Sequence, residues 1–210
     1  MSEENVADRA FTLAEMTSSD SVTMEVLAGR EGRFSQSPPL TEPPVTYLDV
    51  GEAPAYVLTN GKRGIGLGTK RKTVSPDGDR RTVVLVTGRR TLCLVGKRDE
   101  DEVISVPHEA VADVSSKTGF RAHRLALRTP RKMFHCWVHR KTDESVLEAA
   151  AAFIEERQTD APESIDGGDD ANRVMYRGRP VAPQEPTPEP EEKQTRYYRG
   201  QPINDDDGDK

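Results

Sequence analysis

Short apolar runs separated by turn residues fill the middle of the chain, from about Leu48 to His139. Runs that are rich in Val, Leu and Ile and bounded by Gly, Pro, Asn or Asp are typical of β-strands. The sequence therefore predicts about seven strands. In this interpretation, residues 65–74 form one strand, and Asn60-Gly61 forms a hairpin turn after the strand before it.

A helix is predicted directly after the strands. Thr142 or Asp143 is a suitable N-cap, and the helix runs from Glu144 to about Arg157. Apolar side chains recur at helical spacing along it, at Val146, Leu147, Ala150, Phe153 and Ile154. Because such a stripe needs an apolar partner, we expect the helix to close the open end of the β-structure.

Both ends of the chain differ in composition from the middle. Overall, 34% of residues are apolar and 31% are charged. This number of apolar residues is enough for one hydrophobic core but not for two. We expect a flexible acidic and Pro-rich segment over residues 1–47, with a short helix at 19–32 capped by Asp20. A folded domain over 48–158 and a disordered acidic tail over 159–210 follow. The sequence leaves open whether residues 1–44 pack on the domain.

The net charge of −6 hides a strong asymmetry. Residues 51–142 hold 19 basic and 9 acidic side chains, a net charge of +10, whereas residues 1–50 carry −6 and residues 143–210 carry −10. A basic domain attracts phosphate, anionic lipid or acidic protein, and tethered acidic tails can compete for the same surface. The alternative is that the tails only keep a salt-adapted protein soluble.

The order of the predicted elements, together with three segments, resembles prokaryotic pleckstrin-homology-like (PH-like, GRAM-like) domains. The segments are residues 81–95, 103–114 and 118–125, and the resemblance covers about residues 54–157. It implies a mainly β fold, a seven-stranded antiparallel PH-like roll or barrel capped by one C-terminal amphipathic helix. It also implies a non-catalytic adaptor. The chain departs from the family pattern at Gly88, where the turn often has Asp, and in the Gly- and Lys-rich segment before Arg80.

One cluster of basic residues stands out as a candidate for contact with an anionic membrane or phosphate. It consists of Lys62, Arg63, Lys70, Arg71, Lys72, Arg80 and Arg81. In PH domains that this arrangement resembles, the loop joining the first strands presents Lys and Arg to phosphorylated headgroups. The alternatives are a solvated basic hairpin and a nucleic-acid interface. A nucleic-acid interface would also use aromatic residues, at Tyr56, Phe120, Phe134 and Trp137.

No pattern of catalytic, cofactor-binding or metal-binding residues is present. The glycines of residues 61–70 have neither Walker nor dinucleotide spacing, so strand bends explain them better. His135 and His139 are four positions apart on one predicted strand, roughly 13 Å, which is too far for one metal ion. Cys93 and Cys136 lie in apolar runs and are expected to be buried thiols. We therefore expect no enzyme activity, no cofactor and no bound metal.

The tail contains a short repeat, Tyr-Arg-Gly-x-Pro followed by a β-branched residue. The repeated positions are Tyr176, Arg177, Gly178 and Pro180 in the first copy, and Tyr198, Arg199, Gly200 and Pro202 in the second. Tyr and Arg are good anchors, and two copies on one tether permit avidity or self-docking, so we expect a partner-binding motif, most simply for a protein. A duplicated spacer is the alternative.

No apolar run is long enough to span a bilayer, and no secretory leader follows Met1. We therefore expect a cytoplasmic protein, with peripheral contact to an anionic membrane as one option.

Overall fold

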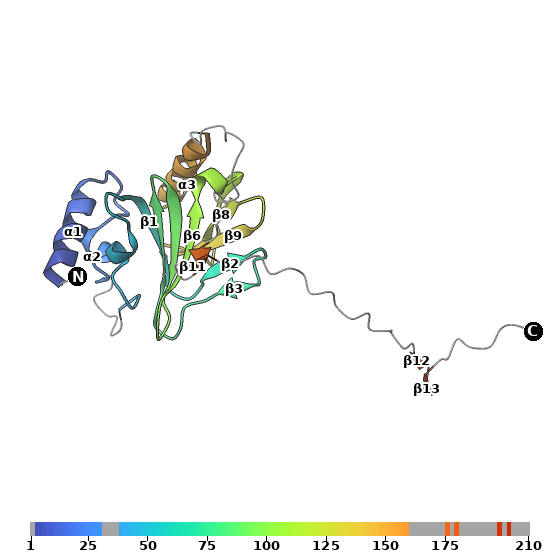
Figure 1. Ribbon diagram of the computed structural model, residues 1–210. Helices are drawn as coiled ribbons and strands as arrows, with labels where there is room; N and C mark the ends of the chain where they lie inside the picture. Colours follow the sequence, from blue (N-terminus) through green and yellow to red (C-terminus); the bar gives the residue numbers. More distant parts are fainter. Residues whose placement is uncertain are drawn as a thin grey trace, which may run out of the picture.

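The computed structural model describes residues 3–30 and 38–159, together with four two-residue strands in the tail (Figure 1). Residues 31–37 and most of 160–210 lie outside the described residues, and so does the prediction of a disordered tail. The described part is mainly β. It consists of two large antiparallel sheets, one helix after them, a helical segment before them and a separate two-stranded sheet in the tail.

The first sheet, sheet A, takes its strands in sequence order, but the chain leaves it twice, once after its first strand and once after its fourth. Its order is β1 (Pro54–Asn60), β4 (Thr82–Thr87), β5 (Arg90–Val95) and β6 (Glu102–Pro107), followed by β10 (Met175–Tyr176) and β11 (Arg179–Pro180) from the tail. Between β1 and β4 the chain leaves for the second sheet. All pairs in sheet A are antiparallel.

The second sheet, sheet B, faces sheet A. Its order is β3 (Thr73–Val74), β2 (Ile65–Leu67), β9 (Met133–Val138), β8 (His123–Arg128) and β7 (Asp113–Lys117). Alternate residues of β8 and β9, such as Leu125, Leu127 and Phe134, point toward sheet A and are fully buried. Cys93 and Cys136 meet in this core as free, buried thiols with their Sγ atoms 3.5 Å apart, so the predicted burial of both is confirmed.

Helix α3 (Glu144–Thr159) closes the core between the sheets, as predicted. Leu147, Ala150 and Ile154 are fully buried, and the Phe153 ring meets the Tyr56 ring of β1 edge to face, with centroids 5.6 Å apart. Asp143 precedes the helix and accepts a hydrogen bond from the backbone N–H of Ser145 (2.9 Å). The fold is therefore mainly β, with two antiparallel sheets closed by one C-terminal amphipathic helix, as predicted.

The number and bounds of the strands differ from the prediction. Between residues 54 and 138, all of which the structure describes, there are nine strands and not seven. Residues 65–74 fold back on themselves as β2 and β3, because Gly68 adopts a positive φ of 75° that lets the chain turn. Residues 108–110 form a 3₁₀ turn (η2, His108–Ala110), so β7 begins at Asp113, later than expected.

The predicted hairpin at Asn60-Gly61 is wrong. β1 pairs with β4, and β2 pairs with β3 and β9, so the chain crosses here from sheet A to sheet B. The buried Asn60 side chain fixes this crossing, since its Oδ1 accepts hydrogen bonds from the backbone N–H groups of Lys62 (3.0 Å) and Arg63 (2.8 Å). A side chain that bonds to the backbone two and three residues later is a common way to form a turn.

The N-terminal segment packs on the outer face of sheet A, where the sequence predicts a flexible segment. It contains α1 (Glu3–Glu15), α2 (Met24–Leu27) and the 3₁₀ turn η1 (Pro44–Tyr47), and Figure 1 shows α1 and α2 on the side of sheet A away from sheet B. A second core forms between this segment and the sheet, and includes Ala10, Leu13, Leu27, Leu40, Val45, Val83, Leu85, Leu92 and Leu94. Residues of this segment therefore share a core with sheet A, and α2 is much shorter than the helix expected at 19–32.

Polar contacts fasten this N-terminal segment to the roll. Asp101 is buried, and its Oδ2 accepts hydrogen bonds from the Tyr47 hydroxyl (2.6 Å) and the Thr41 N–H (2.7 Å). Burial, followed by the hydrogen bond to Asp101, raises the pKa of Tyr47 well above its usual value. The Arg80 guanidinium donates to the carbonyls of Pro38 (3.2 Å) and Leu40 (2.6 Å).

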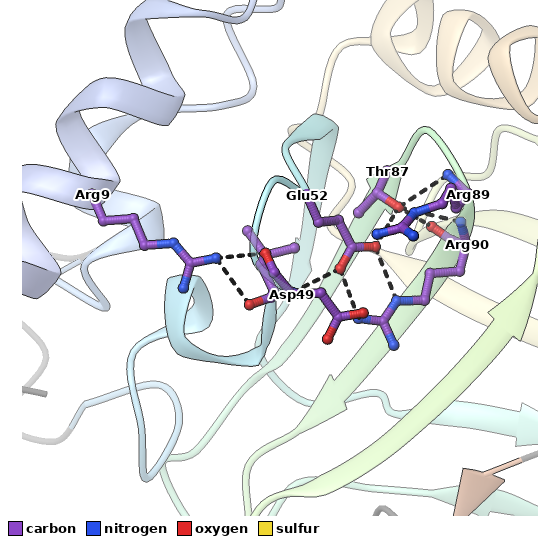
Figure 2. Close-up of polar contacts among 7 residues, drawn as sticks. Arg9, Asp49, Glu52, Thr87, Arg89 and Arg90 are labelled. Atoms are coloured by element: carbon purple, nitrogen blue, oxygen red, sulfur yellow. Dashed lines mark hydrogen bonds and ion pairs between the residues drawn. The ribbon is translucent and has the colours of Figure 1, made fainter.

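A second anchor joins the segment to the β4–β5 turn (Figure 2). Glu52 is buried and accepts two hydrogen bonds from Arg90, from Nε at 2.9 Å and from Nη2 at 2.6 Å. Thr87 Oγ1 donates to the same carboxylate at 2.8 Å. The Arg9 side chain of α1 reaches the carbonyls of Leu48 (2.9 Å) and Asp49 (2.8 Å), so α1 is tied to the same loop.

No helix in the described ranges is long and apolar enough to cross a bilayer.

Candidate functional site

The outer face of sheet B carries a row of basic side chains around the single tryptophan. Lys117, Arg124 and Trp137 lie directly opposite one another on β7, β8 and β9. Arg124 and Trp137 alternate with buried residues of their strands, such as Leu125 and Cys136, so their side chains point away from the core, and Lys117 is the cross-strand partner of Arg124. Lys117 is exposed, and Arg124 and Trp137 are half-buried.

Two guanidinium groups lie against the Trp137 ring. Arg63, from the turn after β1, has its Cζ 4.6 Å from the ring centroid, and Arg124 has its Cζ 5.9 Å away. A cation within about 6 Å of an indole face is attracted by the negative potential of the ring. Trp137 therefore holds together two positive charges that would otherwise repel. We call Arg63, Lys117, Arg124 and Trp137 the basic face.

His135 lies two residues before Trp137 on β9, so both side chains are on the same face of the strand. It is buried, and burial, followed by the positive charges of Arg124 and Lys70, lowers the pKa of its imidazole below the usual value. Its Nδ1 and the Nε of Arg124 are both buried and have no hydrogen-bond partner among the described residues. A buried polar atom without a partner is costly, and it commonly marks a place where a further group binds.

The structure brings together only some of the basic residues that the sequence predicts to form one cluster. Lys62 and Arg63 are exposed in the turn after β1, and Lys70, Arg71 and Lys72 are exposed in the turn between β2 and β3. Of these five, Arg63 belongs to the basic face, and Lys70 lies close enough to influence His135.

Arg80 and Arg81 do not join the cluster. The Arg80 guanidinium is used in the hydrogen bonds to Pro38 and Leu40, which hold the N-terminal segment. Arg81 is half-buried, and its backbone N–H donates to the Pro39 carbonyl (2.9 Å). The Arg80 side chain therefore has a structural role, whereas only the backbone of Arg81 is used here and anion contact by its side chain stays a prediction.

Sequence reasoning missed the contribution of Lys117 and Arg124 to a binding surface. The alternation of Arg124 to Arg128 was a usable signal, because it places Arg124 and Arg128 on the outward face together. Arg128 is less available, since its Nε lies 3.6 Å from the Asp113 carboxylate. The pairing of Arg124 with Trp137 depends on the register of β8 and β9, which the sequence alone does not specify.

The four aromatic residues considered for nucleic-acid stacking divide into two pairs. Phe134 is in the core, and Tyr56 packs on Phe153. Phe120 is 89% exposed in the turn between β7 and β8, and Trp137 is half-buried on the outward face of β9 beside its two arginines. Two of the four are therefore used in packing, and two are at least partly accessible.

The two faces of the roll thus differ in what covers them. The outer face of sheet A is covered by the acidic N-terminal segment, whose residues 1–50 carry a net charge of −6. Sheet B presents Lys117, Arg124 and Trp137 on its outer face, and Figure 1 shows no described helix lying on that side. The basic face therefore lies on the side of the domain that the N-terminal segment does not cover.

The two tail repeats both contain short paired strands. Tyr176 and Pro180 lie in β10 and β11, and Tyr198 and Pro202 lie in β12 (Tyr197–Tyr198) and β13 (Gln201–Pro202). The other predicted motif residues lie outside the described residues; they are Arg177, Gly178, Arg199 and Gly200. β10 joins sheet A, with Tyr176 opposite Ile104 of β6, whereas β12 and β13 form a sheet of their own.

Comparison with known proteins adds little to this geometry. No family model matches the chain, and no curated protein matches it either. Among solved structures, the Vps36 N-terminal PH domain is similar at 18% identity and a TM-score of 0.38, over 53% of this chain and 86% of that one. A likeness at this level carries no functional argument, so the function has to be argued from the site itself.

Proposed function

We propose that the protein is a non-catalytic binding module that uses the basic face of sheet B to contact an anionic surface, either an acidic protein or an anionic membrane. The supporting observation is that the guanidinium groups of Arg63 and Arg124 both lie against the Trp137 ring, with the Arg124 Nε unpaired among the described residues. Guanidinium groups that are already oriented lose less conformational freedom when they bind a carboxylate or phosphate.

In this proposal the tail repeats recruit a partner, and the whole protein acts as an adaptor. The protein would work in the cytoplasm, at the periphery of a membrane if the anionic surface is lipid. The acidic tail, which carries most of the negative charge of residues 143–210, would compete with weak ligands for the basic face and so favour strongly anionic ones.

The test compares two double variants of the full chain that remove the same charge. Arg63→Gln with Arg124→Gln removes the arginines of the basic face, and Arg89→Gln with Arg98→Gln removes two exposed arginines from the turns of sheet A. Binding to phosphatidylserine vesicles and to poly-glutamate is measured at low salt. Each basic residue near an anionic lipid surface contributes about 1 kcal/mol.

We expect the basic-face variant to bind vesicles or poly-glutamate at least roughly tenfold more weakly than the control variant. Whichever of the two probes binds, vesicle or poly-glutamate, identifies the class of partner. Equal weakening in the two variants would mean that diffuse charge, and not the basic face, attracts the anion. If the unaltered protein bound neither vesicles nor poly-glutamate, the proposal would be contradicted.

Nucleic-acid binding is the alternative, and the exposure of Phe120 favours it. An exposed aromatic ring near basic residues is a typical stacking platform for single-stranded nucleic acid. A gel-shift titration with single- and double-stranded DNA and RNA tests it. A shift that is lost in Phe120→Ala would support this alternative, and unshifted bands at low salt would eliminate it.

A further inference from the structure

The two edges of sheet A are covered by different segments of the chain. At the β1 edge, the Val57 N–H donates to Ser21 Oγ (3.1 Å), and the Pro54 carbonyl accepts from Thr17 Oγ1 (3.0 Å). The N-terminal segment therefore occupies polar backbone groups of this edge. Uncovered edges invite pairing with other chains, so folded proteins usually cover or blunt them.

At the opposite edge, β6 has β5 on one side and the first tail repeat on the other. Ile104 pairs with Cys93 of β5 and also with Tyr176 of β10. β10 and β11 pair with each other as well, with Met175 opposite Pro180, so the repeat adds a hairpin to the sheet. The partner of the β6 edge is thus a segment that lies beyond α3 in the sequence.

The second repeat forms the same hairpin in the same register. Met175 and Tyr176 pair with Pro180 and Arg179, and the equivalent residues Tyr197 and Tyr198 pair with Pro202 and Gln201. The equivalence of the two registers indicates that the repeated sequence encodes the hairpin. A two-stranded hairpin on its own is only marginally stable in water, whereas addition to an existing sheet satisfies its outer backbone groups.

The proline of each repeat fits a segment that ends a sheet. Pro180 lies in β11, which is the outermost strand of sheet A when the first repeat is in place. Proline has no backbone N–H to donate to a further strand, so its presence there discourages more strands from adding. Pro202 lies at the equivalent position of β13. The repeat is therefore suited to cover a sheet edge without creating a new edge to which further strands would add.

We propose that the outer edge of β6 is a strand-addition site for the tail repeat, and that the two copies in this chain are alternative occupants of it. The inference rests on the role of the repeats as binding motifs proposed above, and it names what they bind, namely the domain of their own chain. The first copy occupies the site in the structure, and the second takes its place when the first is removed.

The position of each copy along the tail sets their relative occupancy. Tyr198 lies further from the end of α3 than Tyr176, and the entropy of closing a flexible loop changes only slowly with its length. This difference favours the first copy by roughly threefold. The second copy should therefore bind the β6 edge almost as well as the first copy when the first copy is removed.

Amide hydrogen exchange in four full-length proteins tests the proposal. They are the unaltered chain, a chain with residues 175–180 replaced by Gly and Ser, a chain with residues 197–202 replaced in the same way, and a chain with both replacements. The readout is exchange at β6 amides that point away from β5. The internal control is exchange in β5, which has neighbours on both sides whatever the tail does.

We expect the unaltered chain and the second-copy variant to show slow exchange at β6. The first-copy variant should lose protection by no more than several-fold, and the double variant should exchange at least tenfold faster at β6 with β5 unchanged. Unchanged β6 exchange in the double variant would overturn the proposal. Equal exchange in the first-copy and double variants would overturn the claim that the copies are alternatives.

A synthetic peptide of residues 194–205 provides a second measurement on the double variant, even if its β5 exchange is altered. At millimolar concentration it should restore β6 protection, whereas a scrambled peptide should not, and failure to restore would overturn the proposal. Vesicle binding should depend on Arg63 and Arg124 in all four proteins. If a lysate partner is captured through the repeats while β6 exchange never changes, the recruitment role stands and this inference falls.

Discussion

Glu52 and Arg90 form a two-point ion pair in which Arg90 Nε and Nη2 lie 2.9 and 2.6 Å from the two oxygens of a buried carboxylate. Replacing Arg90 by leucine would leave the Glu52 charge buried without its partner. Breaking a buried pair in this way costs about 3–5 kcal/mol. Urea unfolding of Arg90→Leu should show a loss of free energy of this size, whereas Arg89→Gln, which changes an exposed neighbour, should stay within about 0.5 kcal/mol of the unaltered protein.

The same pair predicts how stability depends on pH. Burial alone would raise the pKa of Glu52, but the hydrogen bonds from Arg90, Asp49 N–H and Thr87 outweigh it and lower the pKa from 4.5 to about 2. A carboxylate whose pKa is lower in the folded state stabilises the protein above its unfolded pKa. The contribution, of order 3 kcal/mol, is therefore complete above about pH 5 and is lost as the pH falls toward 2.

Urea midpoints measured from about pH 6 down to about pH 2 test this dependence. Glu52→Gln should flatten the curve below pH 5, because glutamine does not titrate. Glu109→Gln, at an exposed carboxylate in η2, is the matched control and should leave the slope as it is. The account would be contradicted if Glu52→Gln and Glu109→Gln changed the slope equally.

Leu27 tests whether the N-terminal segment is part of the folded domain. Its side chain is fully buried in the core between α2 and sheet A. Replacing a buried leucine by alanine typically costs about 2–5 kcal/mol, so Leu27→Ala should lower the free energy of unfolding by that amount. Glu25→Ala, in the same short helix but exposed, is the control. If the two variants were equally stable, the segment would contribute nothing to folding.

The sheets and the closing helix could be predicted because their patterns are local. The stripe from Val146 to Ile154 and the short apolar runs before it specify which face of each element is buried. The sequence analysis left open whether the N-terminal segment packs on the domain, although a signal existed. All six residues of β4, Thr82–Thr87, are buried, and a continuous apolar run of this kind indicates that both faces of a strand are covered. The cover for the outer face had to come from elsewhere in the chain.

The site was harder to predict than the fold, because it depends on pairing between distant segments. Arg63 meets Trp137 only because Asn60 directs the chain from sheet A to sheet B, where a hairpin turn seemed the simpler interpretation. Arg124 meets Trp137 because β8 and β9 pair in one particular register. Arg80 was assigned to anion contact on proximity in the sequence, but the Pro38 and Leu40 carbonyls use its guanidinium.

The basic face can be tested most directly through the fluorescence of Trp137, the single tryptophan of the chain. Because Arg63 and Arg124 lie against its ring, an anion that engages either guanidinium changes the surroundings of the indole. Titration with phosphatidylserine vesicles or poly-glutamate at low salt should shift the Trp137 emission in a saturable way. Neutral vesicles should not, and Arg63→Gln with Arg124→Gln should abolish the shift. Binding detected by sedimentation with no change in Trp137 emission would contradict the account, since the anion would then be bound elsewhere.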